Sequence, residues 1–176
     1  MRTLTIEQIR DIAIRAHGTQ KYGEDPYSVH LDAVVSMLGE FGFDSFEDKA
    51  VGLLHDTVED TDLTSEKLIR IGVPIVVVDG VLFCTDEPGV NRKTRKRLTY
   101  ARIKSVIAAC SAYDSVSTTI GVRVKLADRL VNIKKCMKDN PKLLEMYVSE
   151  HHDFCNTYYM PGTNYAMWEH CSKVFD

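Results

Sequence analysis

Apolar residues recur three and four positions apart along most of this 176-residue chain, and this spacing limits its possible folds more than any other feature. Ile6, Ile9, Ala13 and Ala16 show it first, behind Thr5, a residue type that caps helices. Such spacing places side chains on one face of an α-helix, whereas the residues of a strand alternate between two faces. The pattern therefore predicts that most of the chain is helical.

The same spacing and further capping residues predict the remaining helices. They are expected to begin near His30, Ser45, Thr64, Arg92, Thr118 and Asn140-Pro141, with residues 18–26 as a loop and a final helix reaching Val174. Segment 75–83 (IVVVDGVLF) has the β-branched residues of a strand, but a lone strand among helices would have no partner, so we predict a buried helix. We expect one all-α domain over residues 1–176, with its motifs in about 5–135 and C-terminal helices in 141–175.

Composition excludes several classes of protein. Hydrophobic residues make up 44% and charged residues 27%, and the net charge of −3 argues against a dedicated nucleic-acid binder. Five cysteines without a CxxC pair predict reduced thiols rather than a disulfide framework. No apolar run approaches the ~18 residues of a membrane span, and the first residues lead into a helical pattern without an apolar signal region. We therefore expect a cytoplasmic protein with no membrane partner.

The strongest chemical signal is the segment 53–60 (LLHDTVED), in which an apolar helix runs into His55 and Asp56. Adjacent side chains on a helix point about 100° apart, but both can reach one ion at the end of a helix. Imidazole and carboxylate together suit Mn, Fe or Zn. Two ligands do not hold a catalytic metal, so further ligands are required, and His30 and Asp128 are the candidates.

Asp128 lies among apolar residues of a helix that is otherwise suited to the core. A carboxylate there needs a cation, a hydrogen-bond partner or exposure to solvent. The alternatives to a metal site are that Asp128 pairs with Lys125 or Arg129, and that His30 is an ordinary surface or core histidine.

The order of these residues resembles the HD-domain metal phosphohydrolases. Within them, the chain is most similar to the hydrolase domain of the RelA/SpoT family and to its stand-alone relatives, the small alarmone hydrolases. The matching stretches are residues 16–20 (AHGTQ), 26–30 (PYSVH), 53–61 (LLHDTVEDT) and 124–132 (VKLADRLVN). The resemblance implies a helical bundle, one divalent metal, usually Mn²⁺, and removal of the 3′-pyrophosphate from guanosine tetra- or pentaphosphate, (p)ppGpp.

Carried over by position, the resemblance also implies roles for individual residues. The metal ligands would be His30, His55, Asp56 and Asp128. The acids that handle the attacking water and the leaving group would be Glu59 and Asp60, and Asn132 would hydrogen-bond the substrate. His17 also matches a family histidine, for which we expect a structural or supporting role.

Two regions are expected to contact the nucleotide. Residues 92–97 contain five cations in six positions, which is typical of a solvated helix face but also suits a substrate with several phosphates. We predict that Lys93 and Arg97, one helical turn apart, contact phosphate. Where the family has a basic pair and a serine before its Pro-Tyr, this chain keeps one cation, Lys21, with Tyr22 beside it as a stacking surface for a base.

This departure leaves two alternatives to (p)ppGpp hydrolysis. One is an HD phosphohydrolase acting on another nucleotide, and the other is a catalytically weak regulator that binds nucleotides. The sequence does not determine the oligomeric state.

Overall fold

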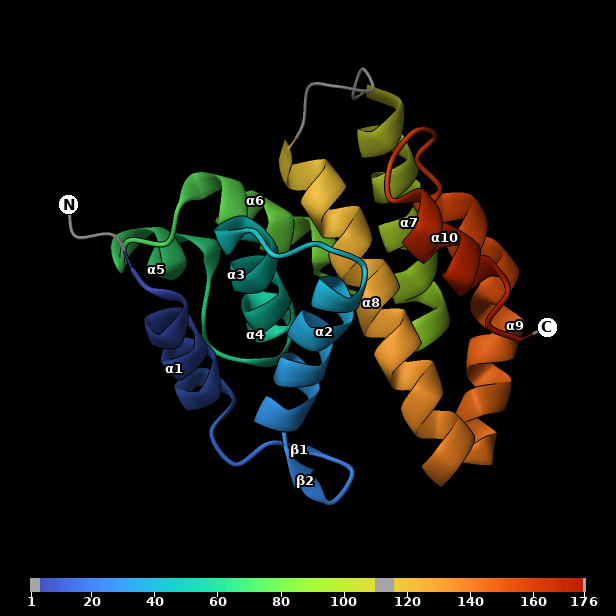
Figure 1. Cartoon of the computed structure of the whole chain (residues 1–176), viewed down its shortest axis with the longest axis horizontal. Helices are drawn as coiled ribbons and strands as arrows, with labels where there is room; N and C mark the ends of the chain where they lie inside the picture. The colour runs from blue at the N-terminus through green and yellow to red at the C-terminus, as the bar shows by residue number, and fades with distance from the viewer. Residues whose placement is uncertain (1–3, 110–115, 176) are drawn as a thin grey trace.

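The computed structural model describes residues 4–109 and 116–175, and within them almost all regular structure is helical (Figure 1). The elements, in chain order, are α1 (Ile6–His17), β1 (Lys21–Tyr22), β2 (Asp25–Pro26), α2 (Ser28–Glu40), α3 (Phe46–Leu54), α4 (Thr57–Asp60), α5 (Ser65–Arg70), α6 (Ile75–Cys84), α7 (Arg92–Ala109), α8 (Val116–Asp139), α9 (Pro141–Tyr158) and α10 (Tyr165–Ser172). The predicted all-α class is confirmed.

Polar side chains begin several of these helices as the sequence predicted. The Thr5 hydroxyl accepts a hydrogen bond from the backbone N–H of Gln8, whose side chain accepts one in return from the Thr5 N–H. Ser45, Thr64 and Asn140 cap α3, α5 and α9 in the same way. Each cap satisfies an N–H that the first helical turn leaves without an intrahelical partner.

Helix α8 is the axis of the fold and carries the central side chains of the site. It packs against α2, α3, α6, α9 and α10, and Figure 1 shows it running diagonally between α2 and α6 on one side and α9 on the other. Val124, Leu126, Ala127, Leu130 and Ile133 are fully buried along it. Asp128 therefore sits inside the molecule because the helix that carries it is packed on several sides.

The apolar segment 75–84 forms a helix, as predicted, and lies close to both α8 and α3. A Cβ atom on Gly121 of α8 would collide with the ring of Phe83, and one on Gly80 would meet the side chain of Val51 in α3 at 2.8 Å. Small residues at these two positions allow the backbones to approach. Val77 and Val81 are fully buried at the same junctions, so burial overrides the strand preference of the β-branched residues.

The structure contains two short elements that the sequence did not predict. The expected loop over residues 18–26 contains the short antiparallel hairpin β1–β2, with Lys21 opposite Pro26. A separate helical turn, α4, follows α3. Helix α7 begins at Arg92, as predicted, and is described to Ala109.

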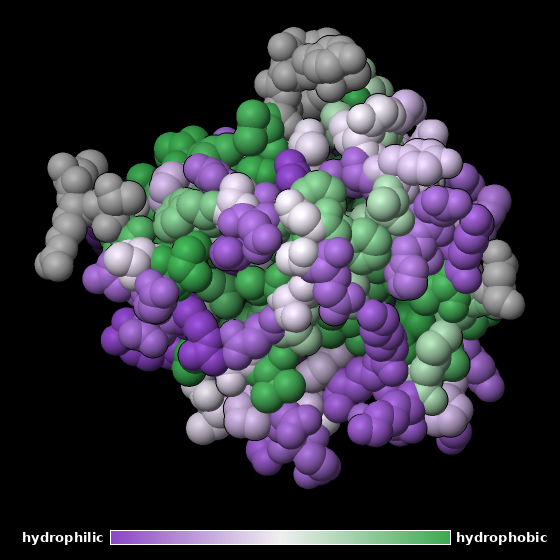
Figure 2. Space-filling model, viewed as in Figure 1, coloured by the Kyte–Doolittle hydropathy of each residue, from purple (hydrophilic) through white to green (hydrophobic). Residues whose placement is uncertain are grey.

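The surface in Figure 2 mixes hydrophilic and hydrophobic side chains across one face of the molecule. In the described part of the chain, no helix combines the length and the apolar character that crossing a bilayer requires. Cys84, Cys136, Cys155 and Cys171 form no disulfides, as predicted, and Cys110 lies outside the described residues.

Candidate functional site

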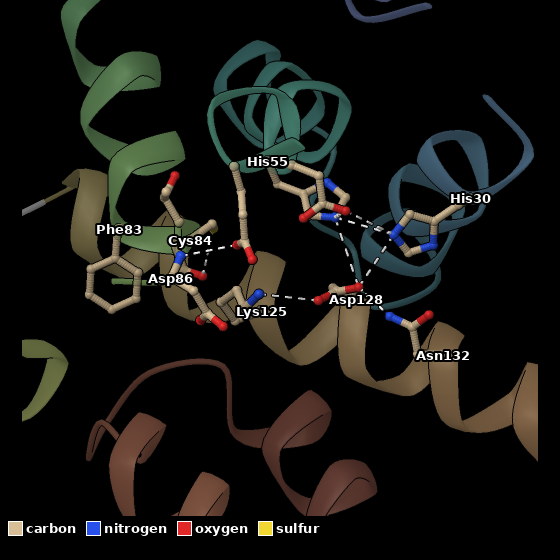
Figure 3. Close-up of polar contacts among 12 residues, drawn as sticks. His30, His55, Phe83, Cys84, Asp86, Lys125, Asp128 and Asn132 are labelled. Atoms are coloured by element: carbon tan, nitrogen blue, oxygen red, sulfur yellow. Dashed lines mark hydrogen bonds and ion pairs between the residues drawn. The ribbon is translucent and has the colours of Figure 1, made fainter. Parts of the chain in front are cut away.

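The four predicted metal ligands converge on one point although they come from three parts of the chain. His30 lies in the first turn of α2, His55 and Asp56 join α3 to α4, and Asp128 lies in the middle of α8. The His30 Nε2 atom lies 3.3 Å from His55 Nε2, 3.5 Å from Asp56 Oδ2 and 3.4 Å from Asp128 Oδ1. Figure 3 shows the side chains of His30, His55 and Asp128 pointing toward one another.

The end of α3 explains how two adjacent residues face the same point. Helix α3 ends at Leu54, and His55 and Asp56 follow it with backbone angles still in the right-handed helical region, so both side chains lie at the end of the helix, where both can reach one point. The Thr57 hydroxyl donates to the Leu54 carbonyl at 2.7 Å and holds this turn. His55 Nδ1 lies 2.8 Å from the Gly52 carbonyl, which fixes Nδ1–H as the donor and turns Nε2 toward the cluster.

This arrangement fits a divalent metal ion. His55 Nε2 lies 2.9 Å from Asp56 Oδ2, and a lone pair and a carboxylate oxygen at that separation repel unless a proton or a metal ion lies between them. His30, His55 and Asp56 each offer a ligand atom within 4.8 Å of the others, and Asp128 Oδ1 lies 3.8 Å from His55 Nε2. Two imidazole nitrogens with two carboxylate oxygens form a donor set for Mn, Fe or Zn.

The surrounding charges keep both carboxylates ionised. Burial opposes ionisation of Asp128, but the charge of Lys125 and the hydrogen bond from His30 hold the pKa of Asp128 well below its usual range. Burial also opposes ionisation of Asp56, and its pKa is likewise lowered, by the charge of His55 and the hydrogen bond from His30. Burial lowers the pKa of His30, yet its bonds to Asp128 and Asp56 outweigh this and raise it to about 9.

The sequence left open that Asp128 pairs with Lys125 or Arg129 instead of binding a metal, and the structure contains the pair with Lys125. Its Nζ lies 3.2 Å from Asp128 Oδ2, while the Asn132 amide donates to Asp128 Oδ1 at 2.5 Å. Arg129, the other alternative partner, instead donates to the Tyr147 carbonyl and lies over the ring of Phe154. Asp128 therefore has both an ion pair and a place in the cluster.

The cluster opens onto a cavity of about 250 Å³ with acidic, basic and aromatic walls. Glu59 and Asp86 line the acidic part. The basic part consists of Arg92, Arg95, Lys96, Lys125 and Arg129. The aromatic part includes Tyr100, Tyr147, Phe154 and Tyr158, most of which come from α9. Sequence reasoning missed the aromatic residues of α9 because they form no spacing pattern beyond that of an ordinary amphipathic helix.

The structure places the two predicted phosphate contacts, Lys93 and Arg97, apart from the basic residues that line the cavity. Lys93 and Arg97 are exposed and lie outside the lining of the cavity, whereas Arg95 and Lys96 line it. At 100° per residue, Arg95 and Lys96 share the face of α7 that buries Thr99, and Lys93 and Arg97 point away from it. The cationic helix was identified correctly, but its orientation was not.

The cations of this wall differ in how they are paired. Arg92 forms a bidentate pair with Glu150 at 2.8 and 2.9 Å, and Lys96 Nζ lies 2.8 Å from Asp86. Burial, with the nearby charge of Lys125, lowers the pKa of Lys96. The buried Nε atoms of Arg95 and Arg129 have no hydrogen-bond partner among the described residues. These two guanidinium groups therefore retain donors for a ligand.

The two predicted catalytic acids lie in different surroundings. Glu59 lines the cavity and accepts a hydrogen bond from the backbone N–H of Asp86 at 3.0 Å. Partial removal from water, and then the charge of Asp86, raise the pKa of Glu59. Asp60 is outside the cavity lining and accepts a hydrogen bond from the Gln20 amide at 3.0 Å.

Of the three residues predicted to contact the nucleoside, two line the cavity and one does not. Tyr22 and Asn132 line the cavity together, and the Tyr22 hydroxyl donates to the Asn132 side-chain carbonyl at 3.0 Å. Both also line a neighbouring cavity of about 490 Å³, which contains Asp25 and Asp139. Lys21 lines neither cavity, because its ammonium group donates to the Glu24 carbonyl within the hairpin.

No family model matches the chain. It is 33% identical over 175 residues to a GTP pyrophosphokinase of Streptomyces coelicolor, an alignment that covers 93% of this chain and 18% of that protein. It is 33% identical over 132 residues to a guanosine-3′,5′-bis(diphosphate) 3′-pyrophosphohydrolase of Aquifex aeolicus, covering 73% of this chain and 17% of that one. The chain thus spans less than a fifth of the length of these curated relatives.

Two solved structures share the fold. One is described as a metazoan ortholog of SpoT that hydrolyses ppGpp, with a TM-score of 0.76 and 22% identity over 99% of this chain and 96% of that one. The other is a protein of Listeria monocytogenes, with a TM-score of 0.65 and 20% identity over 88% of this chain and 96% of that one.

Proposed function

We propose that this chain, an HD-type domain related in sequence to the RelA/SpoT proteins, is a metal-dependent hydrolase that removes the 3′-pyrophosphate of (p)ppGpp. The observation that carries the proposal is the convergence of two histidines and two aspartates beside a cavity that is also lined by five cationic side chains. A site that holds a metal ion beside a polyphosphate needs carboxylates for the ion and cationic side chains for the phosphates. A pyrophosphohydrolase among the relatives supports the choice of substrate.

The metal would be held by His30, His55, Asp56 and Asp128, a donor set that suits Mn, Fe or Zn, and we propose Mn²⁺ because the resemblance to the RelA/SpoT hydrolases implies it. A divalent ion there would lower the pKa of a coordinated water toward neutrality. Ligands must be deprotonated to bind, so both carboxylates are ready for this role, and metal binding would displace the proton that Asp56 and Asp128 favour on His30.

We assign the proton-accepting role to Glu59. It lines the cavity, and its raised pKa brings it closer to the pH at which a general base works well. As the water oxygen attacks the phosphorus that is bound to the ribose O3′, its proton passes to the Glu59 carboxylate. The bond between that phosphorus and O3′ breaks, O3′ takes the electron pair and a proton, and the products are a free 3′-hydroxyl and pyrophosphate. Asp60 keeps its predicted role as the second acid, supported by its neighbouring position in α4.

Arg95 and Arg129 are proposed to bind the phosphates, because each retains a buried Nε–H without a partner among the described residues. A guanidinium can donate two parallel hydrogen bonds to one phosphate. Lys96 adds positive charge but already pairs with Asp86. This assignment replaces Lys93 and Arg97.

The nucleoside is proposed to lie across Tyr22 and Asn132, with its base in the neighbouring cavity. Tyr22 would offer an aromatic surface, and the carboxylates of Asp25 and Asp139 would accept from a base that presents N–H donors on its edge. Guanine carries such donors at N1 and N2. Lys135 also lines this cavity and pairs with Asp139 at 3.0 Å and Asp25 at 4.0 Å, so the base would share these carboxylates with it.

A panel of nucleotides incubated with Mn²⁺ tests the function. Release of pyrophosphate from guanosine tetraphosphate is the expected product. Asp128→Asn should abolish it, whereas Asp32→Asn, the same change at an exposed carboxylate paired with Arg10, should not. Release of single phosphates from other nucleotides would favour the alternative phosphohydrolase. Binding without turnover would favour a regulator.

A further inference from the structure

Tyr27 makes a direct contact with one of the proposed metal ligands. It is the residue that immediately precedes α2, and its hydroxyl donates a hydrogen bond of 2.5 Å to Asp56 Oδ2. The same oxygen faces His55 Nε2 at 2.9 Å and His30 Nε2 at 3.5 Å. The Tyr27 hydroxyl therefore contacts the oxygen atom of Asp56 that points into the cluster.

The ring of Tyr27 is held on more than one side. The imidazole of His17 stacks on it with ring centroids 4.3 Å apart, and the ring of His30 meets it edge-on at 5.4 Å. His17 is fixed in turn, because its Nδ1 lies 2.9 Å from the side-chain carbonyl of Gln20. The Gln20 amide donates to the Asp60 carboxylate, which orients the amide and makes His17 Nδ1 the donor. The phenol therefore cannot swing away from Asp56 without disturbing these neighbours.

Asp56 differs from the other proposed ligands in what orients it. His55 is held by the Gly52 carbonyl, and Asp128 is held by Lys125 and Asn132. Within residues 4–109 and 116–175, Tyr27 is the one group besides the two imidazoles that bonds to the Asp56 carboxylate. Asp56 also lies at the junction of two helices, where the backbone alone constrains a side chain less than in a helix interior.

We infer that Tyr27 is a positioning residue that orients Asp56 toward the metal ion, and that His17 holds Tyr27 in place by stacking. This inference rests on the proposed metal site and extends it to two residues outside the ligand set. Groups that hydrogen-bond a metal ligand orient it, and their loss typically weakens metal binding by about 10- to 100-fold. On this inference Tyr27 and His17 both support metal binding, although neither is a ligand.

Titration of the metal-free protein with Mn²⁺ in a calorimeter tests this without any substrate. Tyr27→Phe keeps the ring and its stacking but removes the hydroxyl, and it should weaken Mn²⁺ binding by at least about tenfold. Tyr165→Phe is the matched control, because Tyr165 is 76% exposed, and it should bind Mn²⁺ like the unmodified chain. At saturating Mn²⁺, kcat of Tyr27→Phe should return to near the unmodified value.

The outcomes separate this inference from the proposed function. Equal Mn²⁺ affinity in Tyr27→Phe and the unmodified chain would overturn the inference and leave the metal site standing. Unchanged affinity with a kcat that stays low at saturating Mn²⁺ would also overturn it, because Tyr27 would then act on the substrate. An unmodified chain that binds no divalent ion would overturn the proposed function itself. Thermal unfolding of the metal-free variants checks that both are folded.

Discussion

Replacing Lys125 with methionine should destabilise the metal-free protein far more than the metal-bound protein. Lys125 is 7% exposed, and its ammonium lies 3.2 Å from the Asp128 carboxylate in the interior. At this distance the attraction is about 5 kcal/mol for an effective dielectric constant of about 20. Methionine keeps most of the side-chain volume but removes the ion pair with Lys125, so that His30 remains as the cationic partner of Asp128. We expect the free energy of unfolding to fall by about 3–5 kcal/mol, the usual cost of breaking a buried pair.

A bound cation changes this expectation. Mn²⁺ at the cluster would provide positive charge beside Asp128 Oδ1, so the lost ammonium matters less. Urea unfolding at saturating Mn²⁺ should therefore show a smaller loss for Lys125→Met than unfolding of the metal-free chain. Equivalently, Mn²⁺ should stabilise the variant by more than it stabilises the unmodified protein.

Two controls isolate the cause. Lys134→Met removes a lysine whose partner Glu40 lies 3.9 Å away with both side chains exposed, and such a surface pair contributes about 0–1 kcal/mol. Adding Asp128→Asn to Lys125→Met removes the charge that has lost this partner and should recover part of the lost stability of the metal-free chain. Equal losses with and without Mn²⁺, or no recovery in the double variant, would refute the reasoning.

Three further changes test other parts of the structure. Gly121→Ala would force a methyl group against the buried ring of Phe83 in α6, so the free energy of unfolding in urea should fall by about 1–3 kcal/mol. An unchanged free energy of unfolding would contradict the close contact between α6 and α8. Asp86→Asn removes a negative charge near Glu59 and should therefore lower the raised pKa of Glu59. The acidic limb of the pH–rate profile should then move to lower pH, and a shift to higher pH would argue against Glu59 as the base. Arg95→Ala should raise KM for the nucleotide about tenfold or more, because a charge-assisted hydrogen bond is lost, whereas Lys93→Ala should change KM little. A larger effect of Lys93→Ala would instead support Lys93 as a phosphate contact.

Local rules predicted the helices because the interactions that begin and end a helix span only a few residues. Thr5, Ser45, Thr64 and Asn140 each cap the helix that the apolar spacing indicated. Segment 75–84 required one argument about the whole fold, that a lone strand has no partner, to be assigned correctly as a helix. The convergence of the four proposed ligands also agrees with the sequence, because the resemblance supplied their identities in order.

The same rules could not find the short elements. A hairpin with two residues in each strand has too few positions to show alternation, and α4 is a single turn formed where α3 ends at the cluster. The aromatic wall from α9 was missed for a different reason. Its residues have the spacing of ordinary core positions, and only the packing of α9 beside α7 and α8 turns them toward the cavity.

The basic segment 92–97 shows most clearly what the sequence determined and what it left open. Its composition identified a cationic helix, but with five cations in six positions almost every direction around the helix carries a charge. Hydrophobic periodicity cannot orient such a turn. The orientation comes from Thr99 and Ile103, farther along α7, which are buried against the rest of the molecule and thereby turn Arg95 and Lys96 toward the cavity. The sequence thus determined which charges are present, whereas long-range packing decided which of them face the site.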